Sequence, residues 1–378
     1  MSCSFTFGTA GTFGTQPVSG CHPLALSNSI AYQDIRGLDC SRPIREATLT
    51  SQPKTEGVLM RKNKVALTLI ASILWSVSFF VSPSHGKLIV GLSSVNVAFL
   101  PVYVAEDRSF FKGEGLDVLL VLFNAGATNL QALIGGDVQI MGSAFVETIG
   151  GRGAGIDVTN FWGICNLMPF QLYSQADFKS MKQAKGKRFA ISRFGSLTDF
   201  LTRATLRHFG IDPKEVTILQ IGSTPARFAA LAAKGVDASV VWFPVTEIAK
   251  SQGFNKLLDL KEIFPEWPYE TFAARESWLN KEKDQVTKFL RAYQRGVKYT
   301  HDNKDDSVRI LKKYVRMDPA YAPAGYDEYR DSFPLNGQIA EKAIPTVMEQ
   351  EFEGGRLKKK LTVEDMIDRS FISSLGKK

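Results

Sequence analysis

The chain has 378 residues, of which 44% are hydrophobic and 22% charged, so it is long enough to bury a large core and to form two or three domains. Its formal net charge is +8, but the residues after position 86 include 39 basic and 34 acidic side chains that are scattered along the chain. Scattered charge is typical of a solvated surface, and it argues against nucleic acid as a partner.

Residues 1–59 are rich in Gly, Ser, Thr and Pro, and no helix or strand period persists in them. We interpret them as a non-native or disordered leader, with Met60 as the true start; a regulatory leader is the alternative. Three of the four cysteines lie in this segment. The fourth, Cys165, lies in an apolar run, and we expect it to be a small buried hydrophobic residue.

Residues 60–86 have the pattern of a secretory signal peptide. Met60 is followed by three basic residues, then by the apolar run VALTLIASILWSVSFFV, then by the small residues Ser84 and Gly86. The pattern predicts cleavage after Gly86 and a periplasmic protein. The alternative is an uncleaved anchor, because the run approaches the roughly 17 residues that span a membrane.

From Lys87 onward, short apolar strands alternate with segments of helical period, which predicts an α/β fold with mainly parallel sheets. The predicted strands are Lys87–Leu92, Leu116–Phe123, Val138–Met141, Val158–Ile164, Arg188–Ile191, Val216–Ile221 and Ala238–Trp242. The helices predicted between them are Pro101–Arg108, Ala127–Ile134, Leu197–Phe209 and Pro225–Lys234.

After about Lys281 the strand pattern ends, and the C-terminal quarter is predicted to be helical. Its amphipathic segments are Lys283–Asp302, Lys304–Tyr314, Pro319–Ser332 and Gln338–Glu353. Two segments also resemble each other, ALIGGDVQIMGSA from Ala132 and ALAAKGVDASVVWFP from Ala230. Each has a helix that ends near a glycine, followed by a strand and a loop. This similarity predicts two related lobes.

The loops that follow the predicted strands are rich in small and hydroxyl residues. Such loops leave backbone N–H groups open at the start of the next helix, where an anion or polar group can bind. In open α/β sheets ligands bind at the carboxyl ends of the strands. The loops are Ser93–Asn96, Asn124–Thr128, Gly142–Ala144, Ser192–Thr198, Gly222–Thr224 and Trp242–Pro244.

Five segments together carry a family resemblance: GLSSVNVAFLPVYVAEDRSFFKGEGLDVLLV, NLQALIGGDVQIMGSA, KGKRFAISRFGSLTDFLTRATLRHFGID, GSTPARFAALAAKGVDASVV and VTKFLRAYQRGVKYTHDNKDDSVRILKKY. In these segments the mature chain resembles the solute-binding proteins of the sulfonate, nitrate, taurine and thiamine-pyrimidine group, which are SsuA-like. The fungal relatives of this group make the thiamine pyrimidine.

The resemblance implies a type II periplasmic-binding fold with two lobes and a hinge. Lobe 1 would comprise residues 87–173 and 270–378, and lobe 2 residues 174–269, with crossings near Gln171–Ser174 and Tyr269–Ala274. The implied partners are a small-molecule ligand and the permease and ATPase subunits of an ABC importer. We expect a monomer with no cofactor and no enzymatic activity.

The family's ligand site, carried over by position, nominates eight residues: Ser94, Asn96, Ala127, Ser143, Arg193, Ser196, Thr198 and Trp242. Arg193 would be the full positive charge among the strand-end loops, so a small organic anion is the first expected ligand. The alternative, that Arg193 is a surface residue paired with Asp199 or Asp177, stays open. An aromatic or pyrimidine compound is the second expected ligand, held by a wall formed from Trp242, Phe243, Phe99, Phe145 and Trp162.

Two other function classes remain as alternatives. A pyrimidine synthase would need a cofactor-binding Lys, a donor His and a cysteine-rich stretch. The mature chain has two histidines, His208 and His301, and one cysteine, Cys165. We expect both histidines to be surface or capping residues. A sensory module would present the ligand to a receptor, and the sequence contains no pattern that favours it over transport.

Overall fold

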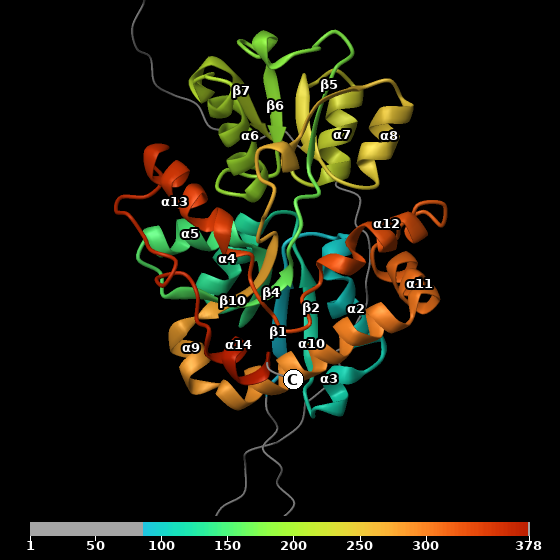
Figure 1. Cartoon of the computed structure of the whole chain (residues 1–378), viewed down its shortest axis with the longest axis vertical. Coiled ribbons are helices and arrows are strands. Elements are labelled where there is room, and N and C mark those ends of the chain that lie inside the picture. Colours follow the sequence, from blue (N-terminus) through green and yellow to red (C-terminus); the bar gives the residue numbers. More distant parts are fainter. Residues whose placement is uncertain (1–85, 377–378) are drawn as a thin grey trace, which may run out of the picture. The chain divides into compact units, whose positions relative to one another are not determined.

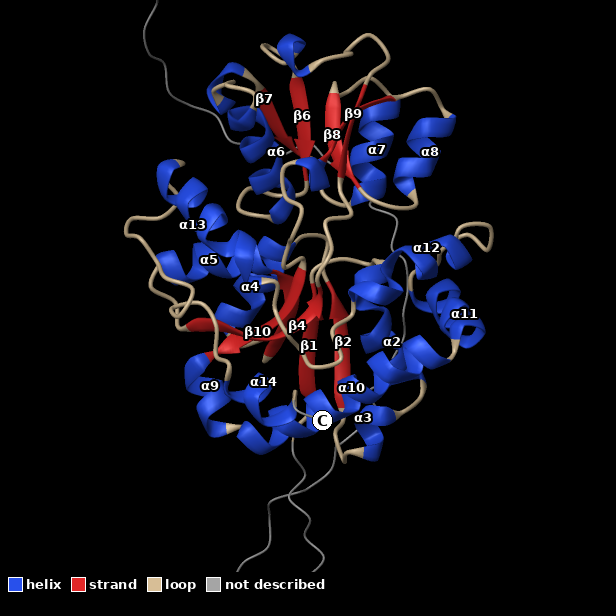
Figure 2. Cartoon of the chain, in the orientation of Figure 1, coloured by secondary structure: helices blue, strands red, loops and turns tan. Residues whose placement is uncertain are grey.

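The computed structural model describes residues 86–376. Our predictions for the leader and for the signal peptide up to residue 85 concern residues outside this range. The described chain forms two five-stranded sheets flanked by helices (Figures 1 and 2). Within this range, the structure contains no helix with the length and apolar character that crossing a membrane requires.

Sheet A has the strand order β2-β1-β3-β10-β4. β1 pairs in parallel with β2 and β3, whereas β10 pairs antiparallel with β3 and β4. β1 reads LIVGL and is almost wholly buried, as expected for a parallel strand with helices on both faces. The strands are β1 (Leu88–Leu92), β2 (Val118–Leu122), β3 (Ile140–Ala144), β4 (Val158–Cys165) and β10 (Glu270–Arg275).

Sheet B repeats this arrangement with the order β7-β6-β8-β5-β9. β6 pairs in parallel with β7 and β8, and β5 pairs antiparallel with β8 and β9. In each sheet, therefore, a single strand runs against its neighbours, which confirms the prediction of mainly parallel sheets. The strands are β5 (Gln171–Ser174), β6 (Arg188–Ile191), β7 (Thr217–Gln220), β8 (Ala238–Val241) and β9 (Asn255–Asp259).

The two faces of sheet B bury alternate residues of its strands. Phe189 belongs to a cluster with Phe200 of α6, whereas the next residue, Ala190, packs with Leu231 of α7 and Ala249 of α8. Figure 1 shows α6 on one side of the strands and α7 and α8 on the other. The helices that follow strands of either sheet are α4 (Gly126–Gly135), α5 (Phe145–Gly153), α6 (Leu197–His208), α7 (Thr224–Ala232) and α8 (Val245–Ser251).

The C-terminal quarter packs largely on sheet A through the long helix α10. Its buried residues include Val286, Phe289, Tyr293 and Val297, which recur at helical spacing and form one apolar face. Gly296 on this face allows close contact with α2, since a Cβ there would lie 2.3 Å from the carbonyl oxygen of Pro101. The remaining helices are α2 (Leu100–Asp107), α3 (Phe110–Gly113), α9 (Glu276–Lys281), α10 (Lys283–Asp302), α11 (Lys304–Tyr314), α12 (Ala322–Tyr329), α13 (Ile344–Glu353) and α14 (Ser370–Leu375).

Several elements differ from the sequence-based expectation. The predicted helix Gln338–Glu353 begins only at Ile344, where Pro345 lies in the first turn and suits a helix start. The strand predicted at Val138–Met141 lies at Ile140–Ala144. Eight of the α-helices and strands were left unpredicted by the sequence patterns: α3, α5, α8, α9, α14, β5, β9 and β10.

The chain passes between the sheets twice, through residues 166–170 and residues 260–269. The crossing expected at Gln171–Ser174 is instead strand β5 of sheet B, and the one expected at Tyr269–Ala274 overlaps strand β10 of sheet A. β5 and β10 follow the crossings directly, so each starts at the edge of the sheet where the parallel strands end. Each therefore runs antiparallel to its neighbours. The exact lobe boundaries stay a prediction.

Candidate functional site

A cavity of about 710 Å³ lies where the loops after the strands of both sheets meet the two crossings. Its lining comes from the loops after β1, β2, β6, β7 and β8, from the crossings and from the turn before α12. The lining residues include Ser93, Ser94, Asn96, Asn124, Gly126, Glu147, Phe170, Ser192, Ser196, Leu197, Thr198, Thr224, Arg227, Trp242, Phe243, Tyr269 and Glu270. The volume falls in the range of organic-ligand pockets.

Five of the eight nominated residues line this cavity: Ser94, Asn96, Ser196, Thr198 and Trp242. Two of them already hold the loops in place. The Asn96 side chain accepts a hydrogen bond from the Ala98 N–H at 2.6 Å, and Thr198 Oγ1 accepts one from the Ser192 N–H at 2.9 Å. Asn96 thereby caps a short helix, and Thr198 fixes the loop after β6, so both side chains contribute local order to the cavity rim.

The other three nominated residues lie outside the cavity lining. Ala127 donates its N–H to Ser196 Oγ at 3.3 Å, which joins the two lobes. Ser143 is buried, and its hydroxyl donates to Glu147 Oε2 at 2.9 Å. Arg193 is exposed and donates to Thr128 Oγ1 at 3.3 Å, so its guanidinium contacts α4 from outside the cavity and is paired with neither Asp199 nor Asp177.

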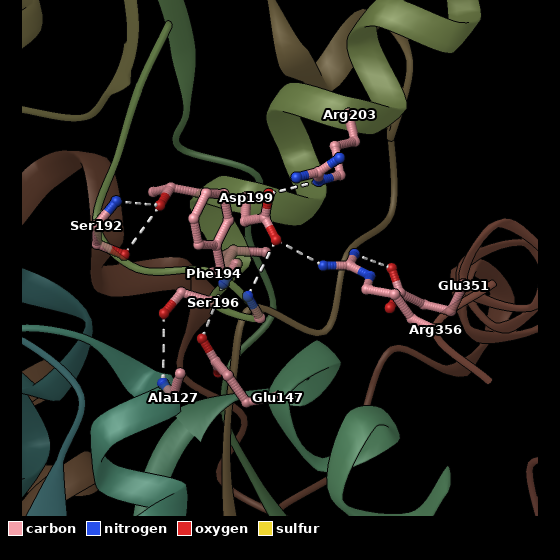
Figure 3. A network of polar contacts seen from close by, with 12 residues as sticks. Ala127, Glu147, Ser192, Phe194, Ser196, Asp199, Arg203, Glu351 and Arg356 are labelled. Carbon is pink, nitrogen blue, oxygen red and sulfur yellow. Dashed lines mark hydrogen bonds and ion pairs between the residues drawn. The ribbon is translucent and has the colours of Figure 1, made fainter. Parts of the chain in front are cut away.

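Glu147, which the sequence reasoning missed, is the buried centre of the contact between the lobes (Figure 3). It lies on α5 of the sheet A lobe, and its Oε1 accepts the N–H of Leu197, the first residue of α6, at 2.9 Å. Burial raises the pKa of this carboxyl to about 7, even though hydrogen bonds from Leu197 and Ser143 act in the opposite direction.

Glu270 is a second buried carboxyl in the cavity wall. It begins β10, where it is paired with Ala144 and Cys165 of the neighbouring strands. The Ser93 hydroxyl lies 3.4 and 3.5 Å from its two oxygens. Burial, and after it the charge of Glu147, raise the pKa of Glu270 well above its usual value. This shift favours the protonated form of the carboxyl, which can both donate and accept hydrogen bonds.

The buried cation of the cavity is Arg227 on α7, a residue that the sequence reasoning also missed. Its Nη1 donates to the carbonyl of Gly222 at 2.6 Å, and its Nη2 donates to Thr224 Oγ1 at 3.0 Å and to the carbonyl of Val240 at 3.2 Å. Burial lowers the pKa of this guanidinium to about 9. Among residues 86–376 it has no carboxylate partner, and its Nε has no hydrogen-bond partner.

Aromatic rings form one wall of the cavity, although not the set that was expected. Phe170 makes edge-to-face contacts with Trp242 at 5.3 Å and with Tyr269 at 5.0 Å between ring centroids. Phe170 and Tyr269 end the two crossings, and Trp242 follows β8. Of the expected rings, Trp242 and Phe243 line the cavity, whereas Phe99, Phe145 and Trp162 are core residues outside its lining. We call Phe170, Trp242 and Tyr269 the aromatic wall.

A network of ion pairs beside the cavity also joins the lobes (Figure 3). Asp199 of α6 is almost fully buried and pairs with Arg203 at 2.6 Å and with Arg356 at 2.8 Å. Arg356 lies after α13 and also pairs with Glu351. Because Asp199 belongs to the sheet B lobe and Arg356 to the C-terminal part, opening of the lobes would separate this pair.

The described residues offer no cluster of three or more His, Cys, Asp or Glu that could hold a metal ion. His208 is exposed at the end of α6, and His301 is partly exposed near the end of α10. Cys165 is buried and contacts Ser332, as expected for a small core residue, and burial raises the pKa of its thiol.

Comparison with known proteins identifies relatives of this chain. The model of the NMT1/THI5 like family matches residues 96–307. The YtlA protein of Bacillus subtilis is 26% identical over 288 residues, which cover 72% of this chain and 85% of that protein. The taurine-binding periplasmic protein of Escherichia coli is 29% identical over 199 residues, covering 51% of this chain and 60% of that protein. This chain thus matches less than two thirds of the taurine-binding protein.

A third relative is an enzyme, and two of the similar solved structures are binding proteins. The pyrimidine phosphate synthase THI11 of Saccharomyces cerevisiae is 24% identical, covering 58% of this chain and 67% of the synthase. The alkanesulfonate-binding protein SsuA from Xanthomonas axonopodis has a TM-score of 0.65 at 19% identity, covering 76% of this chain and 100% of that one. The nitrate-binding protein NrtA from Synechocystis has a TM-score of 0.62 at 13% identity, covering 78% and 89%. The fold is therefore that of the periplasmic binding proteins.

Proposed function

Since the chain belongs to the NMT1/THI5-like family, we propose that it is the substrate-binding subunit of an ABC importer, which captures one small organic molecule between its lobes and delivers it to a membrane permease. The observation that carries this proposal is the cavity of about 710 Å³ between the strand-end loops of sheets A and B. The taurine-binding and alkanesulfonate-binding relatives support it. Closure of the lobes would then distinguish the loaded protein from the empty one.

We further propose that the protein acts in the periplasm as a monomer. The pattern of residues 60–86 and the periplasmic relative support export. N-terminal sequencing of exported material should find a start at or near Lys87, and a product that still carries residues 1–59 would contradict export through this segment.

The cavity favours a planar organic ligand over a small inorganic ion. Its volume is many times the roughly 30 Å³ that one water occupies in the liquid, so an ion of nitrate size would leave most of it unfilled. In the aromatic wall Trp242 is partly exposed, and its ring gives a planar molecule a surface on which to pack. Glu270 and Asn96 supply hydrogen-bonding groups beside that wall, which suits a ring that carries N–H groups.

A small organic anion is the second candidate ligand, and Arg227 is the observation that favours it. This guanidinium is buried and without an ion-pair partner in the described chain, so a carboxylate could offset its desolvation. Arg227 also lies 5.5 Å from the Trp242 ring. An aromatic ligand with an acidic substituent would satisfy both observations.

A thermal-shift screen tests the function and separates these ligand classes. Ligand that binds only the folded state raises the melting temperature. We expect aminopyrimidines and related N-heteroaromatic compounds to stabilise the protein more than aliphatic sulfonates do. A matched pair of variants, Trp242→Ala in the wall and Trp278→Ala on α9 outside the cavity, would assign the effect to the site. A complete absence of stabilisation by small molecules would contradict the proposal.

We propose that the chain catalyses no reaction. Among the residues that the structure describes, the cavity lining contains no His, Lys or Cys, whereas the synthase chemistry considered above needs a Lys and a His at the substrate. Incubation of the protein with pyridoxal phosphate should give no Schiff-base absorbance and no pyrimidine product. Formation of either would favour the synthase alternative.

A further inference from the structure

Two helices, one from each lobe, begin at the cavity without a cap from their own N-cap side chain. The N-cap residue of α4 is Ala125, which has no capping group, and the N-cap of α6 is Ser196, whose hydroxyl makes no bond to its own helix. The first-turn N–H groups of both helices therefore need partners from elsewhere. Such helix ends attract negative charge and are common anion sites.

The partners come from the opposite lobe. Ser196 at the start of α6 accepts the N–H of Ala127 in α4 at 3.3 Å. Glu147 of the sheet A lobe accepts the N–H of Leu197 in α6 at 2.9 Å, and its second oxygen accepts the Ser143 hydroxyl at 2.9 Å. Each uncapped helix is thus capped across the cleft (Figure 3).

The carboxyl of Glu147 occupies the place that an external oxyanion would take. We define the cradle as the Leu197 N–H, the Ser143 hydroxyl and the start of α4 at Gly126. A Cβ on Gly126 would lie 2.3 Å from Cδ and Oε1 of Glu147 and 2.7 Å from Ser143 Oγ. Glycine at this position is therefore what lets the carboxyl approach the helix so closely.

Three of the residues nominated as an anion site, Ala127, Ser143 and Ser196, surround this cradle. The cradle presents hydrogen-bond donors, as an oxyanion site does, but the carboxyl of Glu147 already accepts from them. We propose that Glu147 is a specificity-determining residue, which excludes sulfate and sulfonates by occupying the cradle as an internal substitute for them. This inference deepens the proposed ligand site and rests on the cavity being that site.

The test measures oxyanion binding by the exported protein with and without Glu147. Calorimetry with sulfate and with ethanesulfonate should show no saturable binding to the wild type at pH 8. Glu147→Ala removes the charge and opens the space next to the cradle donors, and we expect its affinity for sulfate to be at least about tenfold higher than that of the wild type.

Two control variants distinguish the cradle from a general charge effect. Glu262→Ala removes the same charge from an exposed position and should leave sulfate binding as weak as in the wild type. Adding Gly126→Ala to Glu147→Ala places a methyl group in the vacated space and should abolish the gained binding. Equal sulfate affinity in wild type and Glu147→Ala, or an equal gain in Glu262→Ala, would overturn the inference.

If Glu147→Ala fails to fold in dilute buffer, its refolding becomes the measurement. Sulfate or acetate should then restore the native circular dichroism spectrum, because the anion replaces the lost carboxyl as a cap of α6. Failure to refold with either anion would overturn the inference. These measurements do not use the compounds of the ligand screen, so a failure of the inference can be told apart from a failure of the proposed function.

Discussion

Gly126→Ala tests the packing around Glu147 directly. The new methyl group would lie 2.3 Å from the carboxyl carbon of Glu147 and 2.7 Å from Ser143 Oγ, and real contacts of this kind do not fall below about 3 Å. Glu147 is buried, and its carboxyl accepts hydrogen bonds from the Leu197 N–H and the Ser143 hydroxyl, so any movement of the carboxyl would break these bonds. The change must displace either the carboxyl or the start of α4.

The expected loss of stability follows from three terms. Overpacking costs about 1–3 kcal/mol, and separating a buried carboxyl from its donors costs about 1–3 kcal/mol. Replacing glycine by alanine in a helix returns up to about 1 kcal/mol. We therefore expect the free energy of unfolding to fall by about 1–6 kcal/mol, as measured by urea denaturation followed by circular dichroism.

Gly150→Ala is the matched control, since Gly150 lies on α5 with no neighbouring atom within 4 Å of the place its new methyl group would take, and the change should be neutral or slightly stabilising. In a Glu147→Ala background, Gly126→Ala should cost less than it does in the wild type, because the obstructing carboxyl is gone. If Gly126→Ala is as stable as Gly150→Ala, or if its cost is unchanged in that background, the described cradle is wrong.

Three further outcomes are expected. The pKa of Glu147 is about 7 in the native protein and 4.5 in the unfolded chain, so between these pH values the native protein binds more protons at this group. The contribution of Glu147 to stability should therefore fall by about 3 kcal/mol as the pH rises from 4.5 to 7 and stay constant above that. Urea titrations of wild type and Glu147→Gln should differ by that slope, and parallel pH profiles would contradict it. Asp199→Asn should weaken the pairing with Arg356 and, in small-angle scattering without ligand, increase the radius of gyration relative to wild type; an unchanged radius would mean that the pair does not hold the lobes together. Trp242→Ala should weaken binding of an N-heteroaromatic ligand by about tenfold or more in calorimetry while the melting temperature without ligand changes little; equal affinity would remove the aromatic wall from the site.

The sequence predicted the strands whose apolar runs are buried on both faces and the loops that follow them. β1 and β6 lie where their patterns placed them, and Ser94, Asn96, Ser196, Thr198 and Trp242 line the cavity. Short stretches of sequence are enough to predict these features. Parallel strands end at the same edge of their sheet, so the loops that follow them lie together.

The charged groups of the site could not be predicted in the same way. Glu147 lies in the segment FVETIGGRG, whose three glycines obscure a helical pattern, and its partner Leu197 is 50 residues away. Arg227 lies on a predicted helix, where an arginine is ordinarily assigned to the solvent face. Arg193 was chosen because it follows a strand, but the turn directs it outward to Thr128. Such orientations depend on tertiary contacts that periodicity does not encode.

The aromatic wall has a practical consequence for redesign of this protein as a biosensor. Phe170 and Tyr269 end the two segments that connect the lobes, and the centroids of their rings lie 5.0 Å apart. A substitution that alters recognition at these rings would also alter the mechanical linkage between the lobes, so signal amplitude and ligand preference would change together. Ser94 and Asn124 line the cavity but belong to neither connecting segment, and libraries at these positions should change selectivity with less effect on the opening and closing response.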